Sequence, residues 1–205
     1  MSGVYAFDGV VPVVDPAAFV HPAAVLIGDV IVGPNCYVGP LACLRGDFGR
    51  IVMEAGSNLQ ETCVVHSFPD LEVVIEEEGH IGHGAVLHGC RIGRNAMVGM
   101  NAVVMDEAVV GENSIVAAMA FVKAKDRIPP NSLAVGAPAR VVRELSAKEI
   151  EWKRRGTGVY RKLAAEARDK LVACAPLTAV EPDRRRVSAP TYDPLFLERL
   201  KFGDG

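Results

Sequence analysis

Aliphatic residues recur at every sixth position along two long stretches of the chain. They stand at Val20, Leu26, Val32, Val38 and Leu44, and again at Ile92, Val98, Val104, Val110, Val116 and Val122. A small residue usually stands two positions earlier, and a glycine or asparagine often follows. Residues two apart in an extended segment face the same side, so each small–x–aliphatic pair points inward. The glycine or asparagine then lets the chain turn.

A strict period of six predicts a parallel β-helix. Short strands of this kind cannot bury a face alone, but parallel coils of them build one continuous core. A period of six matches neither the 3.6 residues of an α-helix turn nor the heptad of a coiled coil. We therefore expect an all-β domain of hexapeptide repeats over residues 1–145. The repeat slips in "RGDFGRIV" and in "SFPDLEVVIEEEG", which we expect to be loops or corners leaving the coil.

The six-residue repeat does not continue into the last 60 residues of the chain. Residues 146–175 are predicted to form an α-helix, with Ser146 as its N-cap and Glu149 completing a capping box. Gly156 and Gly158 are expected to break or kink this helix. Residues 176–205 contain four prolines and the run "DRRR", which is typical of a loosely ordered tail.

Composition excludes several classes of protein. The net charge of −3 argues against a nucleic-acid partner. No apolar stretch reaches the ~20 residues of a membrane helix, and the N-terminus lacks the pattern of a signal peptide. Five cysteines without a C-x-x-C pair are typical of reduced thiols. A soluble cytoplasmic protein with no membrane partner is expected.

The repeat also places the polar residues. Arg45, Gln60, His66 and His88 each follow an inward aliphatic residue and are predicted to face outward at a turn, and His83 lies outside as well. These side chains could then converge only where another surface packs against them, so a metal bound there would lie between subunits. Simple solvated histidines remain the alternative. His80 and His21 lack this relation and are expected to be bystanders.

Three neutral imidazoles leave a divalent ion with open coordination positions, which is typical of a catalytic site. Water bound to such an ion becomes a nucleophile near neutral pH. Gln60 could orient the resulting hydroxide. Zinc, iron, cobalt and nickel all suit three imidazoles.

The motifs "RGDFG", "NLQETCVVHS" and "HIGHGAVLHG", set within hexapeptide repeats, resemble the γ-class carbonic anhydrase family. The resemblance implies a left-handed β-helix and a homotrimer with metal between subunits. It implies His66, His83 and His88 as ligands, with His83 donated by the neighbouring subunit. It further implies an intersubunit ion pair of Arg45 with Asp47, and Gln60 as the residue that holds the metal-bound water.

A second resemblance runs over nearly the full length and rests on the segment from "GHIGHGAVLHGCRIG" to "AMAFVKA" and on the later "ELSAKEIEWKRRGTGVY". These residues resemble the families of PaaY, a phenylacetic acid degradation protein, and CaiE, a carnitine operon protein. This resemblance implies a metal-dependent thioesterase, in which metal-bound hydroxide attacks the carbonyl of a phenylacetyl-CoA-type thioester. The alternatives are reversible CO₂ hydration, an accessory role in carnitine and CoA metabolism, a hexapeptide acyltransferase, or a non-catalytic trimeric scaffold. Phe48 stands where the carbonic anhydrases carry a glutamate, and their long acidic loop is missing, which argues against CO₂ hydration.

Basic residues gather near the end of the coil. Lys123, Lys125 and Arg140 are candidate contacts for the phosphates of CoA. A solvated charged rim is the alternative.

Overall fold

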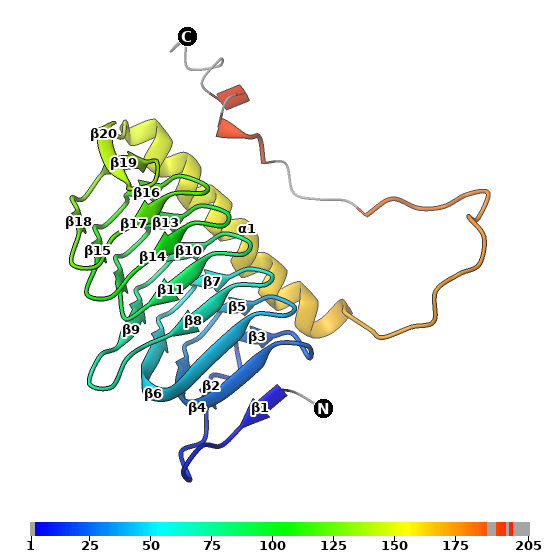
Figure 1. Ribbon diagram of the computed structural model, residues 1–205. Coiled ribbons are helices and arrows are strands. Elements are labelled where there is room, and N and C mark those ends of the chain that lie inside the picture. The colour runs from blue at the N-terminus through cyan, green and yellow to red at the C-terminus, as the bar shows by residue number, and fades with distance from the viewer. Residues whose placement is uncertain (1–2, 188–191, 196, 199–205) are drawn as a thin grey trace.

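A computed structural model describes residues 3–187, 192–195 and 197–198. Its strands run parallel from coil to coil and form a left-handed parallel β-helix with three faces (Figure 1). The first, which we call the helix-covered face, consists of β3 (Phe19–Val20), β5 (Tyr37–Val38), β7 (Asn58–Leu59), β10 (His80–Ile81), β13 (Met97–Val98), β16 (Ile115–Val116) and β19 (Ser132–Val135). The last strand, β20 (Arg140–Glu144), pairs antiparallel with β19 and ends the coil.

The other two faces share their longest strands. The second face, called here the apolar face, holds β1 (Gly3–Tyr5), β4 (Val25–Val32), β6 (Cys43–Met53), β8 (Val64–His66), β11 (Val86–His88), β14 (Val103–Val104) and β17 (Phe121–Val122). The third face holds β2 (Val13–Val14), β9 (Val73–Ile75), β12 (Arg91–Ile92), β15 (Val109–Val110) and β18 (Arg127–Ile128). Strands β4 and β6 pass around the corner from the second face to the third.

The prediction that "RGDFGRIV" leaves the coil is wrong, because the whole segment lies within β6. Two stacked glycines make this corner without a separate turn. Gly28 has a φ of 70°, and a Cβ at this position would lie 2.4 Å from the carbonyl oxygen of Gly46. In the second slipped segment only residues 67–72 leave the coil, since β9 follows directly.

The predicted inward residues form the core. Leu26, Val38, Leu44, Val98, Val104, Val110, Val116 and Val122 have no exposed surface, and neither do most of their small partners. The turns between strands include a row of asparagines in the left-handed region, namely Asn95, Asn113 and Asn131. Their side chains are hydrogen-bonded in series across three coils, at 2.7 and 2.9 Å. Core and turns therefore repeat with the same register.

Helix α1 (Ala147–Lys170) lies along the helix-covered face and packs on β3, β5 and β7 (Figure 1). The predicted capping box of Ser146 and Glu149 is confirmed. The expected break at Gly156 and Gly158 is wrong, because the helix runs through both residues. Gly156 instead permits close packing, since a Cβ there would lie 2.4 Å from the Tyr192 hydroxyl oxygen. This helix is not long and apolar enough to cross a membrane, and no other described helix is.

Lys153 connects α1 to the coil through hydrogen bonds. Its side chain is almost fully buried, and its ammonium donates hydrogen bonds to the carbonyl oxygen of Glu78 at 2.7 Å and to Asn95 Oδ1 at 2.9 Å. Burial lowers the pKa of Lys153 to about 7. The lysine thus joins the helix to the end of the asparagine row.

Part of the expected tail packs against α1. Trp152 stacks on Tyr192 with ring centroids 5.5 Å apart, and its Nε1 donates to the carbonyl oxygen of Asp193 at 2.8 Å. Loose order was expected for all of residues 176–205, so this segment departs from the prediction. Residues 188–191, 196 and 199–205 lie outside the described part of the chain.

Candidate functional site

His66 and His88 stand side by side on the apolar face. They pair directly in the register of β8 and β11, which brings His66 Nδ1 within 3.1 Å of His88 Nε2. The remaining ring nitrogens face carboxylates. Asp47 Oδ1 lies 3.1 Å from His66 Nε2, and Asp106 Oδ1 lies 2.6 Å from His88 Nδ1. Each imidazole is therefore held between a carboxylate and the other imidazole.

These contacts determine which ring nitrogens carry hydrogens. An ionised carboxylate only accepts hydrogen bonds, so the nitrogens that face Asp47 and Asp106 carry the hydrogens. If both rings are neutral, their inner nitrogens present two lone pairs to each other. Desolvation is the main cause that lowers the pKa of His66, which favours its neutral form. The pair is thus arranged to share a cation, and carboxylates on the outer nitrogens are the usual partners of metal-binding histidines.

Two phenylalanines flank the pair. Phe48 lies against His66 and Phe68 against His88, with ring centroids 5.3 and 4.9 Å apart. Both side chains are more than half exposed. These rings cover part of each imidazole and offer no proton acceptor.

Arg45 and Asp47 pair within one protomer, with Arg45 Nη1 2.6 Å from Asp47 Oδ2. Desolvation raises the pKa of Asp47, but hydrogen bonds from Arg45 and His66 outweigh it and lower the pKa below its usual value. Asp47 therefore stays ionised and orients His66. We refer to Arg45, Asp47, His66, His88 and Asp106 as the paired-histidine half-site.

His83 belongs to a second cluster. Its Nδ1 lies 2.5 Å from Glu61 Oε2, and Glu61 Oε1 accepts a hydrogen bond from the Tyr37 hydroxyl at 3.0 Å. Desolvation raises the pKa of Glu61, but hydrogen bonds from its own backbone, Tyr37 and His83 bring it below the usual value. With Nδ1–H donated to Glu61, the Nε2 lone pair of His83 remains available to a ligand.

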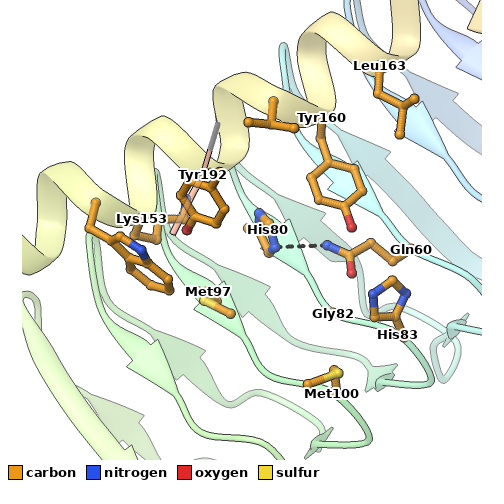
Figure 2. Close-up of a pocket in the computed structure, with 13 residues that line it drawn as sticks. Gln60, His80, Gly82, His83, Met97, Met100, Lys153, Tyr160, Leu163 and Tyr192 are labelled. Carbon is orange, nitrogen blue, oxygen red and sulfur yellow. Dashed lines mark hydrogen bonds between the residues drawn. The ribbon is translucent and has the colours of Figure 1, made fainter. Parts of the chain in front are cut away.

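Gln60 lies beside His83 and faces away from the coil interior, as predicted, but its side chain is buried. Its Nε2 donates to Asn58 Oδ1 at 3.0 Å and to His80 Nε2 at 2.8 Å (Figure 2). The reason is helix α1, which covers this face and supplies Thr157 within 3.3 Å of His80 Nδ1. Burial lowers the pKa of His80 to about 3, so His80 is a neutral acceptor. His80, expected to be a bystander to metal binding, is a hydrogen-bond partner of the candidate residue Gln60.

The residues around Gln60 and His83 form what we call the single-histidine half-site, because His83 is its one histidine with a nitrogen left for a ligand. Its members are Tyr37, Asn58, Gln60, Glu61, His80 and His83. Strand β11 separates it from the paired-histidine half-site, because His83 precedes this strand and His88 ends it. Among the described residues, no three His, Cys, Asp or Glu side chains converge to hold a metal ion. One protomer therefore holds the two halves at opposite edges of the apolar face.

The basic residues near the end of the coil are exposed. Lys123 Nζ lies 3.7 Å from Asp126 Oδ1, and Lys125 Nζ lies 3.5 Å from Glu107 Oε1. Arg140 donates to the carbonyl oxygen of Ala139 at 2.9 Å. Their role as contacts for the phosphates of CoA stays a prediction.

Sequence reasoning missed Glu61 and Asp106, the carboxylates that orient His83 and His88. A signal was present for Asp106, which follows His88 by 18 residues, about the length of one regular coil. Glu61 directly follows Gln60 in "NLQET" and takes the next outward position at the corner. Extending the coil register from each histidine to the neighbouring coils would have pointed to both residues.

Comparisons with known proteins agree with this architecture. Residues 89–124 match the family model of the bacterial transferase hexapeptide (six repeats). Carnitine operon protein CaiE of Salmonella newport is 57% identical over 187 residues, which cover 91% of this chain and 94% of the relative.

Two solved structures are similar over more than three quarters of the chain. A hexapeptide transferase family protein from Anaplasma phagocytophilum is 35% identical, with a TM-score of 0.76 over 78% of this chain and 95% of that one. A candidate acetyltransferase from Bacillus cereus is 30% identical, with a TM-score of 0.78 over 79% of this chain and 94% of that one.

Proposed function

Because this chain belongs to the CaiE family of hexapeptide-repeat proteins, we propose that it is an enzyme of coenzyme A metabolism that acts on acyl-CoA thioesters. The likeness to the candidate acetyltransferase of Bacillus cereus supports chemistry at an acyl group. The observation that carries the proposal is the set of three histidines with carboxylates. Each of His66, His83 and His88 has one ring nitrogen engaged by a carboxylate and the other left for a ligand.

We propose that the two half-sites meet between copies of the chain in a homotrimer. The apolar face between them exposes Val64 and Phe121, by 42% and 38%, and the adjoining corner exposes Leu41, Met100 and Met119 more strongly. Apolar surface of this kind supports packing against a second copy. A closed ring of three copies would bring the paired-histidine half-site of one protomer to the single-histidine half-site of the next.

The donor set fits a divalent metal such as zinc, iron, cobalt or nickel. His66, His88 and a neighbour's His83 would hold it, with neutral imidazoles kept in one tautomer by Asp47, Asp106 and Glu61. The ion, when bound, supplies Lewis acidity toward a carbonyl oxygen and toward water.

Gln60 is placed to position the group that attacks the thioester carbonyl. Its Nε2 is committed to Asn58 and His80, so its Oε1 can accept a hydrogen bond, and Figure 2 shows this oxygen on the side of His83. An acceptor there would orient the hydroxyl of water or of an acyl acceptor. Because Phe48 and Phe68 line the opposite half-site in place of a proton relay, this arrangement suits thioester hydrolysis better than CO₂ hydration.

Transfer of the acyl group to a small-molecule acceptor is the second candidate, favoured by the similarity to the Anaplasma hexapeptide transferase family protein. Thiol release from acetyl-CoA, hexanoyl-CoA and phenylacetyl-CoA, measured with and without added amines and alcohols, separates the two. Release without an acceptor supports hydrolysis, and release only with one supports transfer.

His88→Ala is expected to abolish thiol release. His21→Ala is the matched control, since His21 directly follows β3 and its Nδ1 accepts a hydrogen bond from the backbone N–H of Ala23. Stopped-flow CO₂ hydration is expected to proceed at the uncatalysed rate. No release from any acyl-CoA under any condition, or equal release by the His88 variant, would contradict the proposal.

A further inference from the structure

A cavity of about 470 Å³ lies between α1 and the helix-covered face, next to the single-histidine half-site. It is lined by Gln60, His80, Gly82, His83, Met97, Met100, Trp152, Lys153, Gly156, Val159, Tyr160, Leu163 and Tyr192. Figure 2 shows His83 and Gln60 at one end of this set, with the helix side chains above them. The volume is within the usual range of small-molecule pockets, roughly 300–1,000 Å³.

The walls are mostly apolar. Met97 and Met100 come from the coil, and Val159, Tyr160 and Leu163 come from the helix. Methionine side chains adapt to ligands of differing shape.

Lys153 does not offer its amino group to the cavity. Its Nζ donates to Glu78 and Asn95 and the whole residue is only 2% exposed, so it lines the wall mainly through its apolar stem. His80 is neutral and bonded to Gln60. An anionic ligand would therefore find no free cation here.

A cationic ligand fits no better. Among the described residues that line the cavity, none is an aspartate or a glutamate. Trp152 and Tyr192 stack on each other at an interplanar angle of 21°, which occupies one face of each ring. Tyr160 is in edge contact with Tyr37 and His80, so the rings do not form a cage for a quaternary ammonium. The uncharged apolar group is the remaining class of ligand.

Resting on the function proposed above, we propose that this cavity binds the acyl part of the thioester, and that the acyl part is a medium-length aliphatic or arylacetyl group. Its carbonyl end lies toward Gln60 and His83, and its apolar end lies among Met97, Val159 and Tyr160. The polar CoA portion stays outside. Acyl length, rather than charge, then determines affinity.

Trp152 provides a direct probe, because it lines the cavity and the chain contains one tryptophan. The titration uses the full-length His88→Ala protein, so that the thioester stays intact. Hexanoyl-CoA and phenylacetyl-CoA are expected to change Trp152 fluorescence, and acetyl-CoA and free CoA are not. Because each buried methylene adds about 0.8 kcal/mol, hexanoyl-CoA should bind at least about tenfold more tightly than acetyl-CoA, whose affinity is measured by isothermal titration calorimetry.

Val159→Phe fills the cavity and is expected to weaken hexanoyl-CoA binding by about tenfold or more while leaving acetyl-CoA unchanged. Ala165→Phe is the matched control, because it adds the same ring on an exposed position of the same helix. If the affinity for acyl-CoA does not depend on acyl length, or if the two variants bind hexanoyl-CoA equally, the cavity is not the acyl site. The proposed action on acyl-CoA would not be affected by either result. Tighter binding of a trimethylammonio-butyryl-CoA than of hexanoyl-CoA would overturn its apolar character.

Methyl phenylacetate tests the cavity as a binding site independently of the proposed action on acyl-CoA. If this neutral probe changes Trp152 fluorescence in the parent protein but not in the Val159 variant, while no acyl-CoA binds, the apolar site is supported and the CoA function is refuted. If neither the probe nor any acyl-CoA binds, the cavity is not a ligand site.

Discussion

Asp106→Asn tests whether a carboxylate prepares His88 to bind a metal. Asp106 Oδ1 lies 2.6 Å from His88 Nδ1, and both side chains are largely shielded from water. An asparagine amide can instead donate to Nδ1, which would move the ring hydrogen to Nε2, the nitrogen 3.1 Å from His66 Nδ1. The pair would then lose one of its lone pairs. Loss of such a partner typically costs 10–100-fold in metal affinity, or about 1.4–2.7 kcal/mol.

Competition between the purified protein and a chromophoric chelator for Zn²⁺ measures this affinity at constant pH. Asp126→Asn is the control. Asp126 lies on the coil next to that of Asp106, and its carboxylate faces Lys123 Nζ, 3.7 Å away, rather than a histidine. The control is expected to match the parent protein, and both variants should keep the parent circular dichroism spectrum. Zinc affinity of the Asp106 variant within about twofold of the parent would refute the assigned tautomer.

Three further perturbations address the helix and the residues beneath it. Because the pKa of Lys153 is lowered to about 7, the unfolded chain binds a proton between pH 7 and 10 that the folded chain lacks, so stability rises with pH there. Urea unfolding at matched protein concentration should therefore show the deficit of Lys153→Met growing by about 2 kcal/mol from pH 7 to 9, whereas a constant deficit would mean an ordinary lysine. Ser146→Ala removes the acceptor of the Glu149 backbone N–H and should cost about 1 kcal/mol in the same assay; no change would show that the cap contributes nothing. His80→Ala releases Gln60 and is expected to lower thiol release about tenfold with metal content unchanged, whereas loss of metal would assign His80 a different role.

The coil could be predicted from the sequence because one signal repeats many times. Each inward position such as Leu44 or Val104 is set by the same strand alternation and is buried as expected. The corner inside β6 could not be predicted in this way, because Gly28 and Gly46 bend continuous strands without a turn and so interrupt the six-residue pattern.

The candidate site could be predicted only in part, for a related reason. The register brings His66 and His88 together because they lie on adjacent coils. It gives no information about α1, which reaches His80 from 77 residues further along the chain. The burial of Gln60 and the cavity both depend on this helix, whose docking leaves no trace in the repeat.

The division of the histidines between two edges of one face has a genetic consequence. If the sites form between subunits, His66→Ala and His83→Ala each inactivate every site in their own trimer. When the two variants are mixed and reassembled, each hybrid ring contains one junction at which both half-sites are intact. Random assembly at equal amounts should therefore restore about a quarter of the parent activity from two inactive parents, a form of intragenic complementation. Cells that carry both alleles would retain function that neither allele provides alone.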